Sequence, residues 1–107
     1  MQKYRNRKTV VDGIEFASKK EAERYKFLRI LEKTGQIKDL KTQVKFELQP
    51  SFRYHDKQIR AIYYVADFVY FRDGKKVVED TKGFITEVYK LKSKMFLFKN
   101  GFEITEI

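Results

Sequence analysis

The sequence predicts one small α/β domain in which a mixed β-sheet is flanked by helices. Helical segments with capping signals alternate with aromatic and β-branched strand segments, and Asp-Gly pairs separate neighbouring strands. The chain has 107 residues, a length that suits a single domain over residues 1–107. Its residues are 42% hydrophobic and 16% aromatic, which is enough apolar material to build a folded core.

The chain begins with a basic segment and a short hairpin. Residues 1–8 carry four cations without an apolar stretch, and we expect them to form a flexible arm. Asp12-Gly13 then separates two β-prone triplets, residues 9–11 and 14–16. This arrangement is a strong signal for a tight hairpin.

A helix is expected after the hairpin, from Ser18 to about Thr34. Ser18 and Glu21 form the S-x-x-E capping box that opens helices, and Gly35 supplies a C-terminal stop. Apolar residues at helical spacing predict the face that packs on the sheet: Tyr25, Leu28 and Leu31.

Three extended segments follow this helix. Residues 37–48 turn to an alternation of apolar and polar side chains, and residues 61–71 are aromatic and β-branched, as in a central strand. Asp73-Gly74 turns the chain into another strand over residues 75–82. Residues 50–58 are interpreted as a loop or a frayed hairpin end.

The end of the chain predicts a second helix and a last strand. The helix is expected from Thr86 to Lys99, with Asn100-Gly101 ending it. Four apolar residues are expected to face the core: Val88, Leu91, Met95 and Phe98. Residues 102–107 alternate and are expected to form the last strand.

Charge and composition narrow the classes of function. The chain has 24 Lys and Arg against 15 Asp and Glu, a formal net charge of +9, so a polyanionic partner is expected, nucleic acid before an acidic membrane surface. The absence of cysteine excludes disulfide scaffolds and thiol chemistry, and the single His55, expected on a surface loop, excludes paired-histidine metal motifs. No apolar run approaches the roughly 18–20 residues that span a bilayer. A reducing, cytoplasmic location is compatible with this composition.

Asp67 is the main chemical anomaly, because it is the only formal charge within residues 61–71. Burial of an unpaired carboxylate is costly, so a cation, a metal or a raised pKa must compensate it. The next strand returns antiparallel and carries Asp80 and Lys82, which share a face because they are two residues apart. If Asp67 faces the same way, two carboxylates and an ammonium group converge.

Such a group suits phosphodiester hydrolysis. Two close carboxylates favour a hard divalent cation such as Mg²⁺, and a neighbouring lysine can polarise a phosphate or orient the attacking water. The non-catalytic alternative is a buried ion pair with a purely structural role. Glu79 lies on the opposite face of the strand and is expected to be solvent-facing or a secondary support.

The first helix offers a third carboxylate. Glu21 shares its side with Tyr25, whereas Glu23 is rotated by roughly 160° because each residue advances about 100°. We therefore expect Glu21 to point toward the sheet and Glu23 to be more exposed. Closing the capping box is an alternative role for Glu21, and the two roles are compatible.

These residues resemble the PD-(D/E)XK nuclease superfamily, whose motif is an Asp followed on the next strand by (D/E)-x-K. Asp67 lies thirteen residues before Asp80-Thr81-Lys82, although Ala66 stands where the signature proline precedes the first Asp. The chain further resembles a family of small phage and prophage proteins, formerly a domain of unknown function, that includes Holliday-junction-resolving enzymes. Five ordered blocks carry this resemblance: residues 8–16, 18–25, 46–50, 64–68 and 78–83.

The resemblance implies a restriction-endonuclease-like core and a Mg²⁺- or Mn²⁺-dependent endonuclease that cuts branched DNA, such as Holliday junctions, in the cytoplasm of a bacterial host. It assigns metal binding to Asp67 and Asp80, with the carbonyl of Thr81 as a further ligand. Glu21 would hold the metal directly or through water, and Lys82 would position the nucleophilic water. A homodimer is expected, because symmetric junction cleavage needs two active sites.

Basic residues outside this group are the expected DNA contacts. They are Lys3, Arg5, Arg7 and Lys8 in the N-terminal arm, and Lys90, Lys92 and Lys94 on the second helix. A solvated helix face is the alternative interpretation of the three helical lysines.

Other functions are compatible with the sequence. They are a nicking or mismatch-directed endonuclease on duplex DNA, a non-catalytic nucleic-acid-binding module on the same fold, and a basic interaction subunit of a larger phage complex. The intact Asp67, Asp80 and Lys82 favour an active nuclease over a degenerate module. The sequence does not locate a dimer interface.

Overall fold

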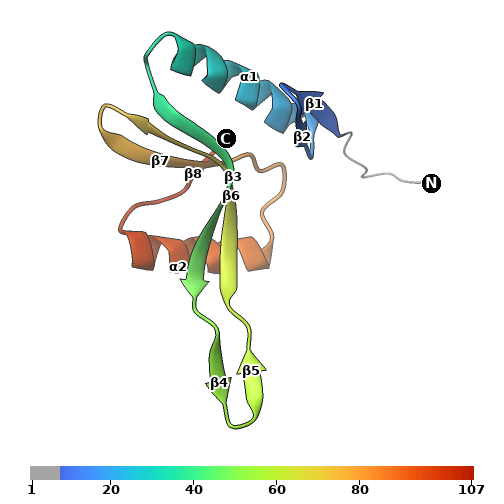
Figure 1. Cartoon of the computed structure of the whole chain (residues 1–107), viewed down its shortest axis with the longest axis vertical. Helices are drawn as coiled ribbons and strands as arrows, with labels where there is room; N and C mark the ends of the chain where they lie inside the picture. The colour runs from blue at the N-terminus through green and yellow to red at the C-terminus, as the bar shows by residue number, and fades with distance from the viewer. Residues whose placement is uncertain (1–7) are drawn as a thin grey trace, which may run out of the picture.

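The computed structural model describes residues 8–107 and confirms a small α/β domain with a mixed sheet and two helices (Figure 1). The elements are, in chain order, β1 (Thr9–Val11), β2 (Ile14–Phe16), α1 (Lys19–Lys33), β3 (Lys38–Gln49), β4 (Phe52–Tyr54), β5 (Lys57–Ile59), β6 (Ile62–Arg72), β7 (Lys75–Asp80), α2 (Glu87–Asn100) and β8 (Thr105–Glu106).

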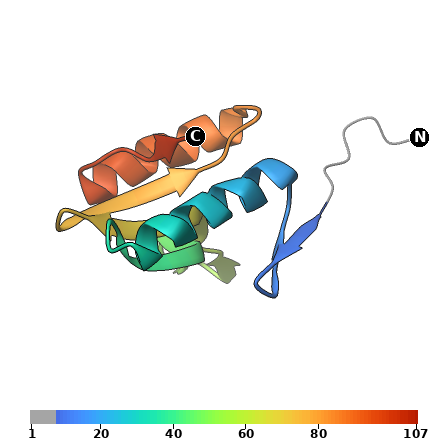
Figure 2. The same cartoon turned by 90° about the horizontal axis from the view of Figure 1, so that it is seen from above.

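The main sheet has four strands in the order β3-β6-β7-β8. The first three are antiparallel, and β8 runs parallel to β7, which makes the sheet mixed. The predicted last strand is shorter than expected: only Thr105–Glu106 pairs with β7, while Ile104 is buried in the core before it. The sheet lies between the two helices, with α1 and α2 on opposite faces (Figure 2).

Two hairpins complete the domain. The predicted β1–β2 hairpin forms beside the N-terminal end of α1. Residues 50–58, expected as a loop or a frayed hairpin end, contribute most of the β4–β5 hairpin, which extends β3 and β6 into a projecting arm (Figure 1). His55 is exposed at the tip of this arm, as predicted for a surface histidine.

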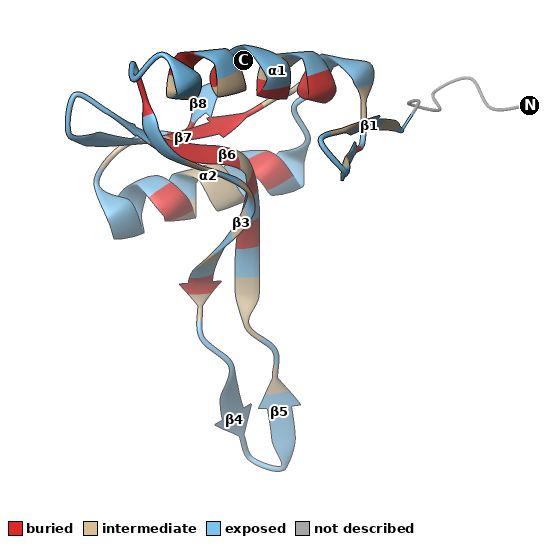
Figure 3. Ribbon diagram, turned by 45° about the horizontal axis from the view of Figure 1, so that its top comes forward, coloured by how far each residue is buried: buried red, intermediate tan, exposed pale blue. Residues whose placement is uncertain are grey.

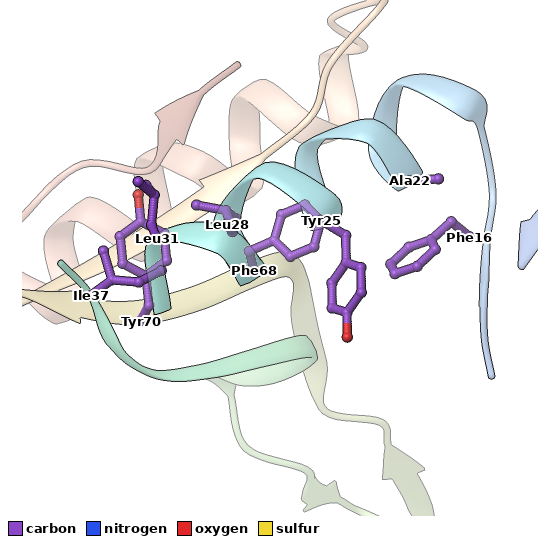
Figure 4. Packing of buried hydrophobic residues seen from close by; sticks show 8 residues of the cluster. All are labelled: Phe16, Ala22, Tyr25, Leu28, Leu31, Ile37, Phe68 and Tyr70. Carbon is purple, nitrogen blue, oxygen red and sulfur yellow. The ribbon is translucent and has the colours of Figure 1, made fainter. Parts of the chain in front are cut away.

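The predicted start, end and buried face of α1 are confirmed. The Ser18 hydroxyl accepts a hydrogen bond from the Glu21 amide, and the helix ends at Lys33 with Gly35 in the left-handed conformation. The predicted apolar face is buried against β6 and the β1–β2 hairpin (Figure 4). Its buried side chains include Tyr25, Leu28 and Leu31.

The rotation of α2 differs from the expectation. Tyr89 and Phe96 are buried, whereas three of the four residues expected in the core, Val88, Leu91 and Phe98, are exposed. The reason lies in the sheet, where aromatic side chains of β3 and β6 form the surface against which Phe96 packs. The Phe96 ring lies edge-on to the Phe46 ring, with 5.1 Å between the ring centroids. Within residues 8–107, neither helix is long and apolar enough to cross a membrane.

The central strand β6 changes face in its middle. Tyr64 and Ala66 pack in the core under α2, whereas Phe68 packs in the core under α1. Strict alternation would put these three residues on one face, so the strand is irregular around Asp67. The β3–β6 register places Gln43 opposite Asp67, and Gln43 has a left-handed φ of 53°. The irregularity of both strands therefore coincides with the position of Asp67.

Candidate active site

Asp67 and Asp80 lie opposite each other on neighbouring antiparallel strands. The β6–β7 register pairs Phe68 with Glu79, and its continuation by one residue places Asp67 beside Asp80. Directly opposite residues share a face, with Cβ atoms about 4.5–5.5 Å apart. The structure therefore brings together the two carboxylates that the sequence analysis singled out.

Thr81 anchors the Asp67 side chain. Its backbone N–H and its hydroxyl both donate to Oδ2 of Asp67, at 2.8 and 2.7 Å. These two bonds hold the carboxylate against the end of β7. The family resemblance implies a role for Thr81 through its carbonyl alone. The anchoring of Asp67 by the amide and hydroxyl of Thr81 is an additional role, and a hydroxyl residue between Asp80 and Lys82 is a usable signal for it.

Asp80 is buried and only partly compensated. The Tyr64 hydroxyl donates to its Oδ2 at 2.7 Å, and Nζ of Lys82 lies 3.5 Å from the same atom. Burial is the main cause that raises the pKa of Asp80, to about 6. The hydrogen bond from Tyr64 lowers this pKa, the neighbouring Asp67 raises it, and the charge of Lys82 lowers it. The pKa is therefore raised because burial and the neighbouring Asp67 outweigh the hydrogen bond from Tyr64 and the charge of Lys82.

Tyr89 holds Lys82 in place. Its Nζ lies 4.3 Å from the centre of the Tyr89 ring, a cation–π contact on the side of the site that α2 covers. The Tyr89 hydroxyl in turn donates to Glu106 at 3.0 Å. Tyr64 and Tyr89 were not identified as site residues from the sequence, because tyrosines in apolar segments look like ordinary core residues.

Glu21 approaches the pair from α1, as its position on the helix predicts. Its side chain is buried and accepts a hydrogen bond from Nε2 of Gln43 at 2.8 Å. The pKa of Glu21 is raised to about 7, first by burial and then by the charge of Asp67, with a smaller contribution from Asp80. Hydrogen bonds from the Ala17 backbone and from Gln43 oppose this rise. Three carboxylates therefore interact electrostatically in one region.

Glu23 lies outside this region. It is exposed and forms an ion pair with Lys26, with 3.0 Å between Nζ and Oε2. This placement agrees with the predicted rotation of α1. The Glu21 amide donates to the Ser18 hydroxyl, and the Glu21 carboxylate accepts from Gln43.

Glu79 requires a correction. It was expected to be solvent-facing or a secondary support, but it is buried on the α1 face of the sheet. Nε and Nη2 of Arg24 donate to its two carboxylate oxygens at 2.9 and 2.7 Å, and the Tyr70 hydroxyl donates to Oε2. Arg24 lies 55 residues away in the sequence, so no local pattern reveals this pairing. Glu79 is thus a neutralised structural carboxylate.

Asp67 borders two hollows, each of about 330 Å³. The first lies between α1 and the β1–β2 hairpin and is lined by Lys8, Glu15, Phe16, Ala17, Glu21, Gln43 and Asp67. The second lies beside α2 and is lined by Tyr63, Tyr64, Val65, Asp67, Asp80, Lys82, Thr86, Val88, Tyr89 and Lys92. The carboxylates are therefore accessible from two sides.

The basic residues expected to contact DNA divide into groups. Lys8 and Lys92 each line one of these two hollows. Lys90 and Lys94 line a separate hollow on the other side of α2, and Lys90 forms an ion pair with Glu87 at 3.1 Å. The remaining three, Lys3, Arg5 and Arg7, lie outside the described residues.

The donor set contains hard oxygen ligands. The hydrogen bonds from Thr81 and Tyr64 each engage only the Oδ2 atom of their carboxylate. Among residues 8–107, no group of three or more His, Cys, Asp or Glu side chains is arranged to hold a metal ion by itself. The chemistry of the pair, two adjacent carboxylates with a shortage of positive charge, fits a hard cation.

Comparison with known proteins gives a family and no function. No curated protein and no solved structure matches the chain. The model of the family described as "Protein of unknown function (DUF1064)" matches residues 1–105. Because this match covers nearly all of the sequence, the chain belongs to the DUF1064 family.

Proposed function

We propose that this protein is a divalent-metal-dependent DNA endonuclease with a restriction-endonuclease-like core, and that its substrate is branched DNA such as a Holliday junction. The observation that supports this proposal best is the pairing of Asp67 with Asp80 beside Lys82. Both carboxylates come from adjacent strands, and one of them has a pKa raised to about 6 by burial. Perturbed carboxylates that border an open hollow are typical of catalytic sites.

The proposed metal is Mg²⁺ or Mn²⁺. Asp67 and Asp80 would hold it, with Glu21 acting directly or through water and the Thr81 carbonyl as a further ligand. Mg²⁺ commonly binds through one or two carboxylates together with waters and substrate phosphates, so a complete protein cage is not required. When bound, the metal supplies positive charge for the scissile phosphate and lowers the pKa of a bound water.

The protein residues have separate tasks in this scheme. Lys82 orients the attacking water and offsets negative charge that develops on the phosphate. Tyr64 fixes Asp80, and Tyr89 restricts Lys82 to the side of the site that faces the second hollow. Lys8 and Lys92 lie at the two hollows, where they can contact phosphates on either side of the scissile bond.

The decisive experiment is a cleavage assay on a panel of DNAs. The purified full chain is incubated with linear, nicked, flap and four-way-junction DNA in Mg²⁺, Mn²⁺ or EDTA, with Asp80→Asn as the matched inactive control. We expect metal-dependent cleavage of the four-way junction by the wild type alone. Preferred cutting of the linear or nicked duplex would instead favour the alternative, an endonuclease that acts on duplex DNA. A folded protein that binds DNA but cuts none of the panel would overturn the nuclease proposal.

Binding without cleavage is measured in EDTA at several salt concentrations. Neutralisation of about 4–6 phosphates per chain predicts a slope of roughly −3.6 to −5.4 for log K against log salt on duplex arms. A slope near zero would exclude DNA as the main partner. That result would favour a protein-interaction subunit instead.

A further inference from the structure

Much of α2 is exposed (Figure 3), and its exposed residues include an apolar stripe. Val88, Leu91 and Phe98 are 62%, 59% and 93% exposed. Met95 completes the series and is partly buried against the core. These four residues, the α2 stripe, are spaced by three, four and three positions, which is the spacing of a seam between paired helices.

The area of this surface is large enough for a specific interface. Phe84, in the segment that leads into α2, is 77% exposed and adds a second large aromatic side chain. The exposed parts of Phe84 and the α2 stripe amount to roughly 500 Å² per chain, from typical side-chain areas. Two copies together would bury about 1,000 Å², which is the lower limit for a specific protein–protein interface.

The charges beside the stripe indicate which partner fits. Glu87 and Lys94 are seven residues apart, nearly two helical turns, so they lie on the same flank of the stripe. If two α2 helices pack antiparallel, Glu87 of each copy meets Lys94 of the other. A parallel two-fold arrangement would instead put the Glu87 and Lys94 residues of the two copies on opposite sides of the seam, where they do not pair. An apolar seam with a self-complementary charge pair suits a second copy of this chain and does not suit a polyanion.

We propose that a second copy of this chain covers the α2 stripe, with the two α2 helices antiparallel and the two-fold axis close to Leu91. Glu87 and Lys94 are placed on either side of this residue, four positions before and three after it. Val88 also lines the hollow beside Asp80, so the interface borders the candidate site. The interface stands on these observations independently of nuclease activity.

The first test compares matched charge insertions by sedimentation analysis. We expect the wild-type full chain to be dimeric at micromolar concentration and Leu91→Glu to weaken the dimer by at least tenfold. Ile30→Glu is the control, because Ile30 on α1 is also 59% exposed but lies outside the stripe. A wild type that stays monomeric up to roughly 0.1 mM overturns the proposal, as does a Leu91→Glu protein that dimerises normally.

The second test uses the absence of native cysteine and does not require a folded Leu91→Glu variant. Leu91→Cys should form an intermolecular disulfide on mild oxidation, whereas Ile30→Cys should not, because only residues near the axis approach their own copy. Glu87→Lys and Lys94→Glu should each weaken the dimer, and the double variant should restore it. Equal cross-linking of both cysteine variants, or no restoration, contradicts the antiparallel arrangement.

These outcomes are separable from those of the cleavage assay. A dimer that cuts no DNA supports the interface proposal and contradicts the nuclease proposal. Cleavage by a protein that remains monomeric supports the nuclease proposal and contradicts the interface proposal.

Discussion

Glu79 and Asp80 are consecutive buried carboxylates on β7, and they face opposite sides of the same sheet. Glu79 is held by two hydrogen bonds from Arg24 and one from Tyr70, so its charge is matched. Asp80 has one hydroxyl donor and a lysine at 3.5 Å, but a second carboxylate, Asp67, lies beside it. Of these two neighbouring acids, Glu79 is therefore fully paired with a cation, whereas Asp80 is only partly compensated.

This difference shows that burial alone does not identify a functional carboxylate. A buried charge with a bidentate guanidinium partner is satisfied, and removal of that partner mainly costs stability. A buried acid next to like charges is destabilised in its ionised form, and only an added cation completes it. The Glu79 side of the sheet is accordingly a structural region, and the Asp80 side is the candidate site.

The largest expected contrast comes from removing one charge on each side. Asp80→Asn should reduce single-turnover cleavage by at least about 10³-fold, because a metal ligand is lost, while DNA binding stays equal or becomes tighter. Glu79→Gln, the matched control, should keep cleavage within about tenfold of the wild type in stably folded protein. Wild-type activity in Asp80→Asn would remove Asp80 from the site.

The same contrast is expected for the two cations, Lys82 beside Asp80 and Arg24 beside Glu79. Lys82→Ala should lower the cleavage rate by about 10²–10³-fold with little change in the free energy of unfolding, because its role is in the transition state. Arg24→Ala should lower the free energy of unfolding by about 3 kcal/mol, because Glu79 is left buried without its partner. Urea titration and single-turnover cleavage measure both variants. An unchanged rate in Lys82→Ala would make Lys82 a structural partner of Asp80.

Glu21 and Glu23 extend the comparison to α1. Glu21→Gln should reduce cleavage by about 10–100-fold, because a carboxylate next to the metal ligands is lost while glutamine still serves the capping position. Glu23→Gln should keep most of the activity, since Glu23 is exposed and pairs only with Lys26 among the described residues. Loss of activity in Glu23→Gln with normal cleavage by Glu21→Gln would show that the third carboxylate is Glu23 and not Glu21.

The smallest effect concerns pH in the metal-free protein. The pKa of Glu21 is raised from 4.5 to about 7, chiefly by burial. Over this window the folded state binds more protons than the unfolded state, so the free energy of unfolding decreases as pH rises. The contribution of Glu21 is complete below about pH 4.5 and lost above about pH 7.

Glu21→Gln removes this dependence. Relative to the wild type in EDTA, its free energy of unfolding should increase by about 3 kcal/mol between about pH 4.5 and pH 8, since one pKa unit corresponds to about 1.4 kcal/mol. Urea titrations at several pH values measure the difference. Glu23→Gln is the control and should show no such trend, and a pH-independent difference for Glu21→Gln would contradict the raised pKa.

The orientation of α1 could be predicted because its signals are local and agree with one another. The capping residues fix where the helix starts, and a single apolar face leaves one rotation that buries it. The position of Glu21 follows from that rotation. In α2, by contrast, apolar residues occur on several sides of the helix, from Val88 and Tyr89 to Phe96 and Phe98. Periodicity alone does not choose among these faces, and the aromatic surface of the sheet decided it.

The sequence by itself determined the pairing of Asp67 with Asp80. The two-residue turn Asp73-Gly74 has left-handed φ angles at both positions, which suits a tight hairpin, and its length sets the register of the two strands. Asp67 and Asp80 are then opposite each other at equal distances from the turn. This inference needs only the turn type and the antiparallel register that the turn sets.

Only the tertiary structure decided which charges are matched. Arg24 on α1 donates to Glu79 on β7. Gln43, at an irregular position of β3, donates to Glu21 on α1. Tyr64 on β6 donates to Asp80 on β7. These contacts join segments that are far apart in the chain, so they depend on how α1, β3 and β6 pack together. Turn and helix geometry act over a few residues and can be read from the sequence, whereas the electrostatic environment of a buried carboxylate depends on every element packed around it.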